Sequence, residues 1–210
     1  MKSAIALAEK GRGFTNPNPL VGAVIVKNGK IIAEGWHHKL GSLHAERDAL
    51  KNASEKKVDV RGASIYVTLE PCCHTGRQPP CTQAIIESGI SEVIYGSSDP
   101  NPLVNGKGKK ILETAGIKVA AGFLKEECDK LNPVFFHYIK NKMPYVILKY
   151  AMTADGQTAT SKAESRWITG QLARKNVHKT RANVMAVLTG IGTAKKDNPM
   201  LNVRLDDGLE

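Results

Sequence analysis

Two stretches, His44-Ala45-Glu46 and Glu70-Pro71-Cys72-Cys73-His74-Thr75-Gly76-Arg77-Gln78-Pro79-Pro80-Cys81, decide how this chain is expected to fold. His44, Cys72 and Cys81 offer one imidazole and two thiolates. A catalytic zinc site uses three such protein ligands and keeps a fourth position open for water. Because one ion can bind all three residues only if they meet in space, the fold must bring the two stretches together.

Glu46 lies two residues after a candidate ligand and is not needed as a ligand itself. In zinc-dependent deaminases, a glutamate beside the metal moves protons between the zinc-bound water and the amine that leaves. The residue types therefore indicate hydrolytic deamination, with Glu46 as the proton carrier.

The expected local structure supports this reading of the ligands. His44 would open a helix at 44–51, Cys81 would open another after Pro79-Pro80, and Cys72 would follow a strand at 65–69. Helix N-termini favour thiolates, which helps to ionise the two cysteines. The alternatives are unrelated buried thiols with a core histidine, or a structural zinc with Cys73 as a fourth ligand. The latter is disfavoured because adjacent side chains of an extended segment project to opposite sides.

Hydrophobic periodicity predicts an α/β fold for the first two thirds of the chain. A helix at 2–10 is followed by strands at 21–27 and 30–35, joined by Asn28-Gly29, a strong hairpin signal. Helices and strands then alternate, which indicates a mixed sheet with parallel later strands between helices. These elements are expected at 44–51, 64–68, 82–88, 92–96, 108–115 and 117–121, before a helical pattern at 125–140 that is interrupted at Asn132-Pro133.

A domain boundary is expected where a polar stretch ends at Pro144, giving domains at 1–143 and 144–210. The second domain is predicted to contain a strand at 145–150, a helix at 169–180 with Thr169 as its N-cap, and a buried strand at 184–188. Only 66 residues run from Tyr145 to Glu210, which suits about one β-α-β unit. We therefore expect an incomplete second domain that is less stable than the first.

Composition narrows the functional classes. The formal charge of +10 raises the possibility of nucleic-acid binding. The basic residues are scattered, however, and the densest run is only Gly106-Lys107-Gly108-Lys109-Lys110, so a solvated surface with a few phosphate contacts is favoured. The N-terminal apolar stretch is too short for a signal peptide, and no segment reaches membrane-spanning length. A cytoplasmic protein is expected, whose four cysteines are ligands or free thiols.

The same motifs closely resemble the deaminase half of the bifunctional riboflavin-biosynthesis deaminase-reductase family. The discriminating detail is the gap of eight residues between Cys72 and Cys81, because nucleic-acid and cytidine deaminases usually have two there. The family usually has serine where this chain has Cys73. The resemblance continues through 16–23 and 99–104 and covers essentially the whole chain. It implies a cytidine-deaminase-like three-layer α/β/α domain with a mixed sheet, followed by the N-terminal part of a dihydrofolate-reductase-like α/β domain.

For the first domain, the resemblance implies deamination of a diaminopyrimidinone ribosylamine 5'-phosphate. Zn²⁺ would be held by His44, Cys72 and Cys81, with Glu46 as the catalytic residue. Amide and imidazole groups suit a ring edge rich in donors and acceptors, and a guanidinium suits a phosphate. The expected substrate-binding residues are Asn18, His37, His74 and Arg77.

For the second domain, the resemblance implies NADPH-dependent reduction of the ribose to a ribityl chain. The matching stretches are 149–156, 165–169, 190–193 and 197–199, although Gly190-Ile191-Gly192 is too short a pattern to establish a nucleotide loop by itself. The resemblance assigns NADPH binding to Ala151, Trp167, Thr193 and Asp197, and substrate binding to Ser165, Arg181, Leu201 and Arg204. Because the chain ends before the family's remaining strands, reductase activity is not expected from it alone.

Two other functional classes stay open at this stage. A deaminase of tRNA or single-stranded nucleic acid is compatible with the charge, but 5% aromatic residues and no aromatic cluster near the site provide little for base stacking. A zinc-stabilised scaffold without catalysis is the third possibility. The expected partners are a small phosphorylated pyrimidine and further copies of the chain, with no nucleic acid and no membrane. The sequence assigns no role to Cys73 or Cys128.

Overall fold

The computed structural model describes residues 1–76, 78–162 and 164–205. It divides the chain into two units, Met1–Tyr145 and Val146–Glu210, close to the boundary expected at 143/144. Each unit is described by itself.

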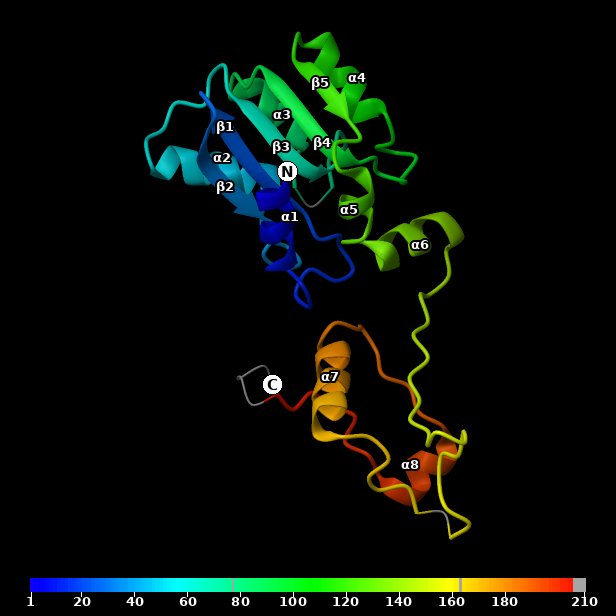
Figure 1. The fold of residues 1–210 in the computed structure, drawn as a ribbon. Helices are drawn as coiled ribbons and strands as arrows, with labels where there is room; N and C mark the ends of the chain where they lie inside the picture. The colour runs from blue at the N-terminus through cyan, green and yellow to red at the C-terminus, as the bar shows by residue number, and fades with distance from the viewer. Residues whose placement is uncertain (77, 163, 206–210) are drawn as a thin grey trace. The chain divides into compact units, whose positions relative to one another are not determined.

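The first unit contains one sheet surrounded by helices, in the order that the sequence predicts (Figure 1). Its strands are β1 (Gly22–Lys27), β2 (Lys30–Trp36), β3 (Ser64–Leu69), β4 (Glu92–Ser97) and β5 (Lys118–Ala121). Its helices are α1 (Lys2–Glu9), α2 (Ala45–Glu55), α3 (Cys81–Glu87), α4 (Lys107–Thr114), α5 (Lys125–Asp129) and α6 (Pro133–Asn141). The interruption at Asn132-Pro133 is confirmed as the break between α5 and α6.

The sheet has the strand order β2-β1-β3-β4-β5. β1 pairs antiparallel with β2 and β3, whereas β3/β4 and β4/β5 are parallel, so the predicted mixed sheet with parallel later strands is confirmed. Asn28 and Gly29 have φ of 52° and 74°, as expected for the tight turn of a hairpin. The parallel strands β3 and β4 end at the same edge, and the segments that follow them meet there.

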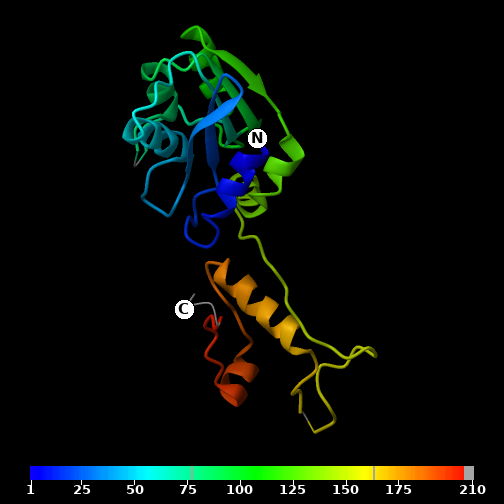
Figure 2. The ribbon, with the colours of Figure 1, turned by 60° about the vertical axis from the view of Figure 1, so that its left-hand side comes forward.

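Helices cover both faces of the sheet (Figures 1 and 2), and side chains from the two faces enter separate cores. Ile25, Ile65 and Val93 face α2, α3 and α4, in a core that includes Ala49 from α2. Val24 packs against α1 in a second, smaller core. This period-two alternation makes β3 and β4 apolar on both faces, as expected of strands covered on both sides. The result is the predicted three-layer α/β/α arrangement.

Two glycines let helices approach the sheet closely. A Cβ on Gly22 would lie 2.0 Å from the Ala4 carbonyl oxygen of α1, and a Cβ on Gly35 would lie 2.2 Å from the Ala49 nitrogen of α2. Both distances are too short for any side chain. Because Gly35 has no side chain, α2 can pack closely against β2. This packing positions the residues after His44, which α2 carries.

Among its described residues, the second unit contains two helices, α7 (Gln171–Ala182) and α8 (Ile191–Asp197). The strands expected at 145–150 and 184–188 are wrong: neither segment is a strand, and Leu148 and Leu188 are 81% and 93% exposed. β-Forming side chains give a strand only when a neighbouring strand accepts its hydrogen bonds, and residues 146–162 and 164–205 offer none. The helix expected at 169–180 is confirmed, but Gly170 rather than Thr169 is its N-cap residue.

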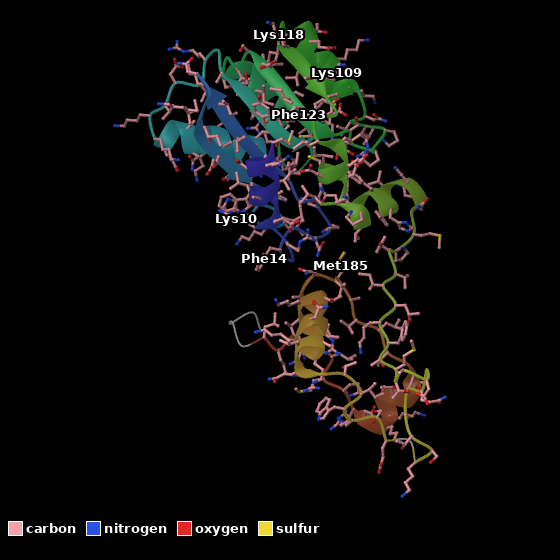
Figure 3. All side chains as sticks on the ribbon, in the orientation of Figure 1. Lys10, Phe14, Lys109, Lys118, Phe123 and Met185 are labelled. Carbon is pink, nitrogen blue, oxygen red and sulfur yellow. The ribbon has the colours of Figure 1, made fainter. Side chains whose placement is uncertain are left out.

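Basic side chains are spread over the first unit rather than gathered on one element. Lys10 follows α1, Lys109 belongs to α4 and Lys118 begins β5, and Figure 3 shows them in different places on this unit. Among the described residues, no helix is both long and apolar enough to cross a membrane.

Candidate metal centre and active-site cavity

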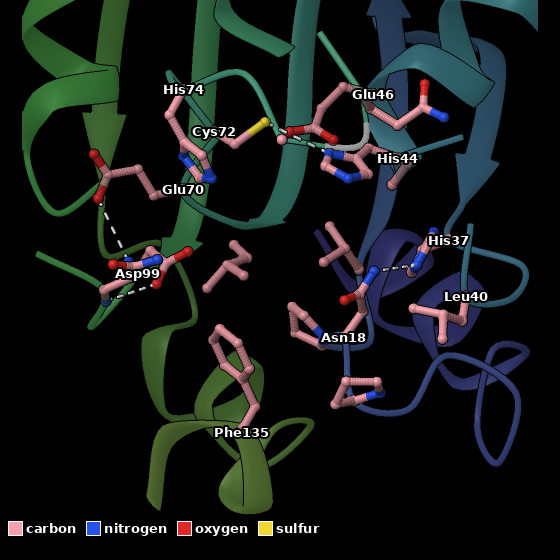
Figure 4. Close-up of a pocket in the computed structure, with 18 residues that line it drawn as sticks. Asn18, His37, Leu40, His44, Glu46, Glu70, Cys72, His74, Asp99 and Phe135 are labelled. Carbon is pink, nitrogen blue, oxygen red and sulfur yellow. Dashed lines mark hydrogen bonds between the residues drawn. The ribbon is translucent and has the colours of Figure 1, made fainter. Parts of the chain in front are cut away.

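A cavity of about 440 Å³ lies beside the ends of β3 and β4. Its volume falls in the range of small-molecule sites. Six parts of the chain contribute to its wall: the loop before β1, the segment after β2, the start of α2, the segment after β3, the segment after β4, and α6 (Figure 4). The residues used below are Pro17, Asn18, His37, His44, Glu46, Cys72, His74, Asp99, Asn101 and Phe135.

The three predicted metal ligands meet at one end of this cavity. His44 is the N-cap residue of α2, Cys81 is the first residue of α3, and Cys72 follows β3, as predicted. The Cys72 and Cys81 sulfurs lie 3.5 and 3.4 Å from His44 Nδ1. All three ligand atoms lie within 4.8 Å of one another.

These distances fit a zinc ion. Tetrahedral coordination with Zn–S near 2.3 Å and Zn–N near 2.0 Å separates sulfur from nitrogen by about 3.5 Å. The pKa of the Cys72 thiol is lowered, chiefly because Cys81 donates a hydrogen bond to its sulfur, and His44 acts in the same direction against the effect of burial. The Cys73 Sγ points instead to the Leu103 carbonyl at 3.5 Å. The described residues therefore supply three ligands and leave a fourth position open.

Glu46 lies in the first turn of α2 and lines the same cavity, where it is only 4% exposed. Burial raises the pKa of its carboxyl to about 7, and the negative charge of Cys72 adds to this. A divalent cation held by the neighbouring ligands would favour the ionised form again. A carboxyl group balanced between its two protonation states is suited to accept and to donate a proton.

Glu70 is a site-shaping residue to which the sequence motif assigned no role. Its buried carboxylate accepts hydrogen bonds from the backbone N–H groups of Asp99, Gly106 and Lys109, at 3.4, 3.2 and 3.5 Å. Glu70 thus attaches the loop after β4 to the segment that carries Cys72. In the sequence, only the position of Glu70 directly before Pro71-Cys72 could have indicated this role. Its hydrogen-bond partners lie about 30 residues or more away along the chain.

Arg47 is a second such residue. Its guanidinium donates hydrogen bonds to the carbonyl oxygens of Pro79 and Pro80, both at 3.1 Å. These carbonyls directly precede the ligand Cys81, so Arg47 ties the segment between the two cysteines to α2. A basic residue following a glutamate on a helix gives no distinct sequence signal, and only the fold reveals this contact.

Asn18 and His37 lie in contact at the cavity wall. The Asn18 Nδ2 lies 3.1 Å from His37 Nε2, and the His37 Nδ1 lies 2.9 Å from the Leu43 carbonyl. A carbonyl can only accept, so Nδ1 carries the proton, Nε2 accepts, and Asn18 must donate. Burial lowers the pKa of His37, which agrees with a neutral ring. The Asn18 Oδ1 is thereby left as an acceptor.

His74 and Asp99 also line the cavity (Figure 4). His74 is exposed, whereas Asp99 is buried and accepts a hydrogen bond from the Asn101 N–H at 2.8 Å. Arg77, expected to bind phosphate, lies outside the described residues. Sequence reasoning did not single out Phe135, which reaches the cavity from α6; an aromatic residue in an amphipathic helix is ordinarily a core residue.

In the second unit, the structure brings only some of the expected residues together. Arg181 Nη1 lies 3.1 Å from the Asn202 carbonyl, and the Arg204 guanidinium contacts the Asn202 side chain, so Arg181 and Arg204 converge next to Leu201. The Trp167 ring stacks against Arg174 at 4.1 Å and is 70% exposed. The remaining residues lie on α8 (Thr193, Asp197) or in segments without regular structure (Ala151, Ser165).

The fold and the candidate metal centre are those of a zinc-dependent deaminase domain, which is followed in the chain by a second unit. Residues 1–97 match the cytidine and deoxycytidylate deaminase zinc-binding region, and residues 144–210 match the RibD C-terminal domain. The whole chain is 60% identical to the riboflavin biosynthesis protein RibD of Actinobacillus pleuropneumoniae, of which it covers 55%. Over its whole length, the chain is similar to proteins of the riboflavin-biosynthesis deaminase-reductase family.

Solved structures agree with this assignment. The diaminohydroxyphosphoribosylaminopyrimidine deaminase/5-amino-6-(5-phosphoribosylamino)uracil reductase of Thermotoga maritima superposes with a TM-score of 0.93 at 52% identity, covering 99% of this chain and 59% of that one. The Aspergillus oryzae Rib2 deaminase in complex with DARIPP has a TM-score of 0.54 at 25% identity, covering 66% of this chain and 91% of that one. The chain spans little more than half the length of the curated relatives that it matches.

Proposed function

We propose that this chain hydrolyses the exocyclic amine of 2,5-diamino-6-(5-phosphoribosylamino)pyrimidin-4(3H)-one to give 5-amino-6-(5-phosphoribosylamino)uracil and ammonia. The observation that carries the proposal is the buried Glu46 carboxyl, which lines the same cavity as three ligands with zinc geometry. A buried carboxyl with a raised pKa beside a candidate metal site is typical of a group that transfers protons, so a catalytic role is favoured.

The residues of the cavity have separate roles in this reaction: three bind the metal and one transfers protons. When zinc is bound, it lowers the pKa of water and so makes a nucleophile available at neutral pH. Glu46 removes a proton from the attacking water and delivers protons to the departing amine, so that one C–O bond forms, one C–N bond breaks and ammonia leaves. His44, Cys72 and Cys81, which come from α2, the segment after β3 and α3, would hold the zinc ion beside Glu46.

Asn18 is proposed to orient the pyrimidine. Its Oδ1 accepts a hydrogen bond from an N–H of the ring edge, because its Nδ2 already donates to His37. In this proposal His37 contributes by fixing the Asn18 amide, since both of its ring nitrogens are occupied. Phe135 adds an apolar wall for the flat ring.

The phosphate end of the substrate is assigned to the segment between the two cysteines. His74 lines the cavity from this segment, and Arg77, which the sequence expectation also includes, belongs to it. The ligand named for the Aspergillus oryzae deaminase, DARIPP, supports a small-molecule substrate of this kind. Lys10, Lys109 and Lys118 lie in different places on the first unit (Figure 3), which does not favour a continuous track for a nucleic-acid backbone.

We propose only the deaminase step for this chain. The resemblance assigns NADPH to Ala151, Trp167, Thr193 and Asp197, but no paired strand in the described part of the second unit holds these residues in one site. NADPH binding, reduction of the ribose by Ser165, Arg181, Leu201 and Arg204, a homo-oligomeric state and a cytoplasmic location stay predictions.

Glu46→Gln tests the proposal. We expect deamination of the diaminopyrimidine phosphate to fall by about 10²- to 10⁴-fold, the usual contribution of a general acid-base group, while zinc content and the circular dichroism spectrum stay unchanged. Glu55→Gln is the matched control, because Glu55 ends the same helix with its side chain 65% exposed; it should keep full activity. Unchanged turnover in Glu46→Gln would refute the mechanism, and a parent chain that deaminates tRNA but not the pyrimidine would refute the substrate.

A further inference from the structure

The side chain of Asn132 bonds to a distant loop instead of capping its own helix. It is the N-cap residue of α6, a place where asparagine ordinarily bonds to its own helix, yet no such bond is formed. Instead, Asn132 Oδ1 accepts a hydrogen bond from the Leu20 N–H at 2.7 Å, and Asn132 Nδ2 donates one to the Leu20 carbonyl at 2.8 Å. Both bonds are buried and join residues 112 positions apart.

This pair of bonds requires an amide at residue 132. The Leu20 backbone presents one donor and one acceptor, and only a side chain with both functions can satisfy them together. Among the described residues, the Leu20 N–H donates its hydrogen bond to Asn132 Oδ1. Leu20 and Leu131 pack in the same small buried cluster as Ala8 of α1, which keeps water away from the bonds.

The two hydrogen bonds between Asn132 and Leu20, called the joint below, connect two walls of the cavity. Asn18 and Pro17 lie just before Leu20, and Phe135 lies three residues after Asn132 on α6; all three line the cavity. Figure 4 shows Asn18 and Phe135 across the cavity from Cys72 and Glu46. The loop that carries Asn18 has no regular secondary structure, so its position depends on such tertiary bonds.

We propose that Asn132 is a positioning residue that sets the substrate-orienting wall of the cavity by fixing the loop of Asn18 against α6. The inference rests on the proposed function, since it assigns Asn18 and Phe135 to the pyrimidine. The metal ligands and Glu46 belong to α2, α3 and the segment after β3, to which the Asn132 side chain is not bonded. Loss of the joint should therefore affect substrate binding far more than the chemical step or zinc binding.

Asn132→Asp is the most direct test, because it preserves shape and one acceptor but places a second oxygen against the Leu20 carbonyl. We expect KM for the diaminopyrimidine phosphate to rise by about tenfold, which corresponds to about 1.4 kcal/mol, with kcat changed less than KM and zinc content unchanged. Asn132→Ala should behave similarly. Asn141→Asp is the matched control: Asn141 lies at the other end of α6, where its exposed side chain contacts His137 at 3.1 Å, so KM should not change.

Hydrogen exchange of the Leu20 amide provides a test that needs no substrate. In the parent chain this amide should exchange slowly although it lies in a loop, and in Asn132→Ala it should exchange faster, while amides of β3 keep their protection. Fast exchange in the parent would refute the joint itself. Suppose that the parent deaminates the pyrimidine and that Asn132→Asp folds with an unchanged KM. That result would refute the positioning role alone. An inactive parent whose Leu20 amide is protected would refute the proposed function but not the hydrogen bonds between Asn132 and Leu20.

Discussion

The two units use similar apolar residues with opposite results. In Met1–Tyr145, the β-branched side chains of Ile65 and Val93 are fully buried between the sheet and the helices α2, α3 and α4. In Val146–Glu210, Leu148 and Leu188 come from segments with an equally strong strand pattern, and they are 81% and 93% exposed. The difference shows that a strand pattern leads to burial only where neighbouring strands and a covering helix complete the hydrogen bonds and the packing.

The same contrast applies to the functional residues. The candidate ligands and Glu46 belong to elements whose ends meet at one edge of a sheet, and packing holds them there. Arg181 and Arg204 of the second unit also converge, but they do so around one exposed asparagine, Asn202. Convergence within a packed core produces a defined site, whereas convergence on a surface leaves long side chains with many conformations.

Hydrogen exchange should separate the two units most widely. Amides of β3 and β4 open only when the first unit unfolds, so we expect them to be protected by roughly a thousandfold or more. Amides at 145–150 and 184–188 have no strand partner among the described residues and should exchange close to the rate of an unfolded chain. Equal protection of both sets, measured by mass spectrometry on the parent chain, would contradict the comparison.

Two substitutions, one of a buried and one of an exposed apolar residue, should sharpen the comparison of the two units. Ile65→Ala should lower the free energy of unfolding by about 2 to 5 kcal/mol, because it leaves a cavity between β3 and the helices. Leu188→Ala removes a side chain of similar size and should change it by no more than about 0.5 kcal/mol. Urea denaturation measures both values, and a large loss of stability in Leu188→Ala would show that the second unit buries this residue in solution.

Glu70→Gln should lower the stability of the first unit less than Ile65→Ala does. Its amide nitrogen would face backbone N–H donors, so we expect a loss of about 1 to 3 kcal/mol and a weaker attachment of the loop that carries Asp99 and Asn101. Glu113→Gln on α4 is the control, since that side chain is 49% exposed and its single ion pair with Lys109 is long at 3.8 Å. If the two substitutions are equally mild in thermal unfolding, Glu70 does not hold this loop.

Sequence reasoning was most reliable where a local pattern already contained the relevant interaction. The Asn28-Gly29 turn, the start of a helix at Cys81 and the break at Asn132-Pro133 depend on backbone geometry within a few residues, and the structure confirms them. The strands at 145–150 and 184–188 were wrong because their partners cannot be read from local sequence. The supporting contacts of Glu70 and Arg47 were missed for the same reason.

The sequence by itself determined the chemistry: one imidazole, two thiols and a spare carboxylate at spacings that suit a metal, because residue type fixes which ligands and proton carriers are available. Only the tertiary structure decided the geometry of the site. It brings sulfur and nitrogen to 3.4 and 3.5 Å, and it leaves Asn18 with a free acceptor and ties the Asn18 loop to α6 through Asn132. These outcomes depend on contacts between residues far apart in the chain, and such contacts arise only when the sheet and its helices pack together.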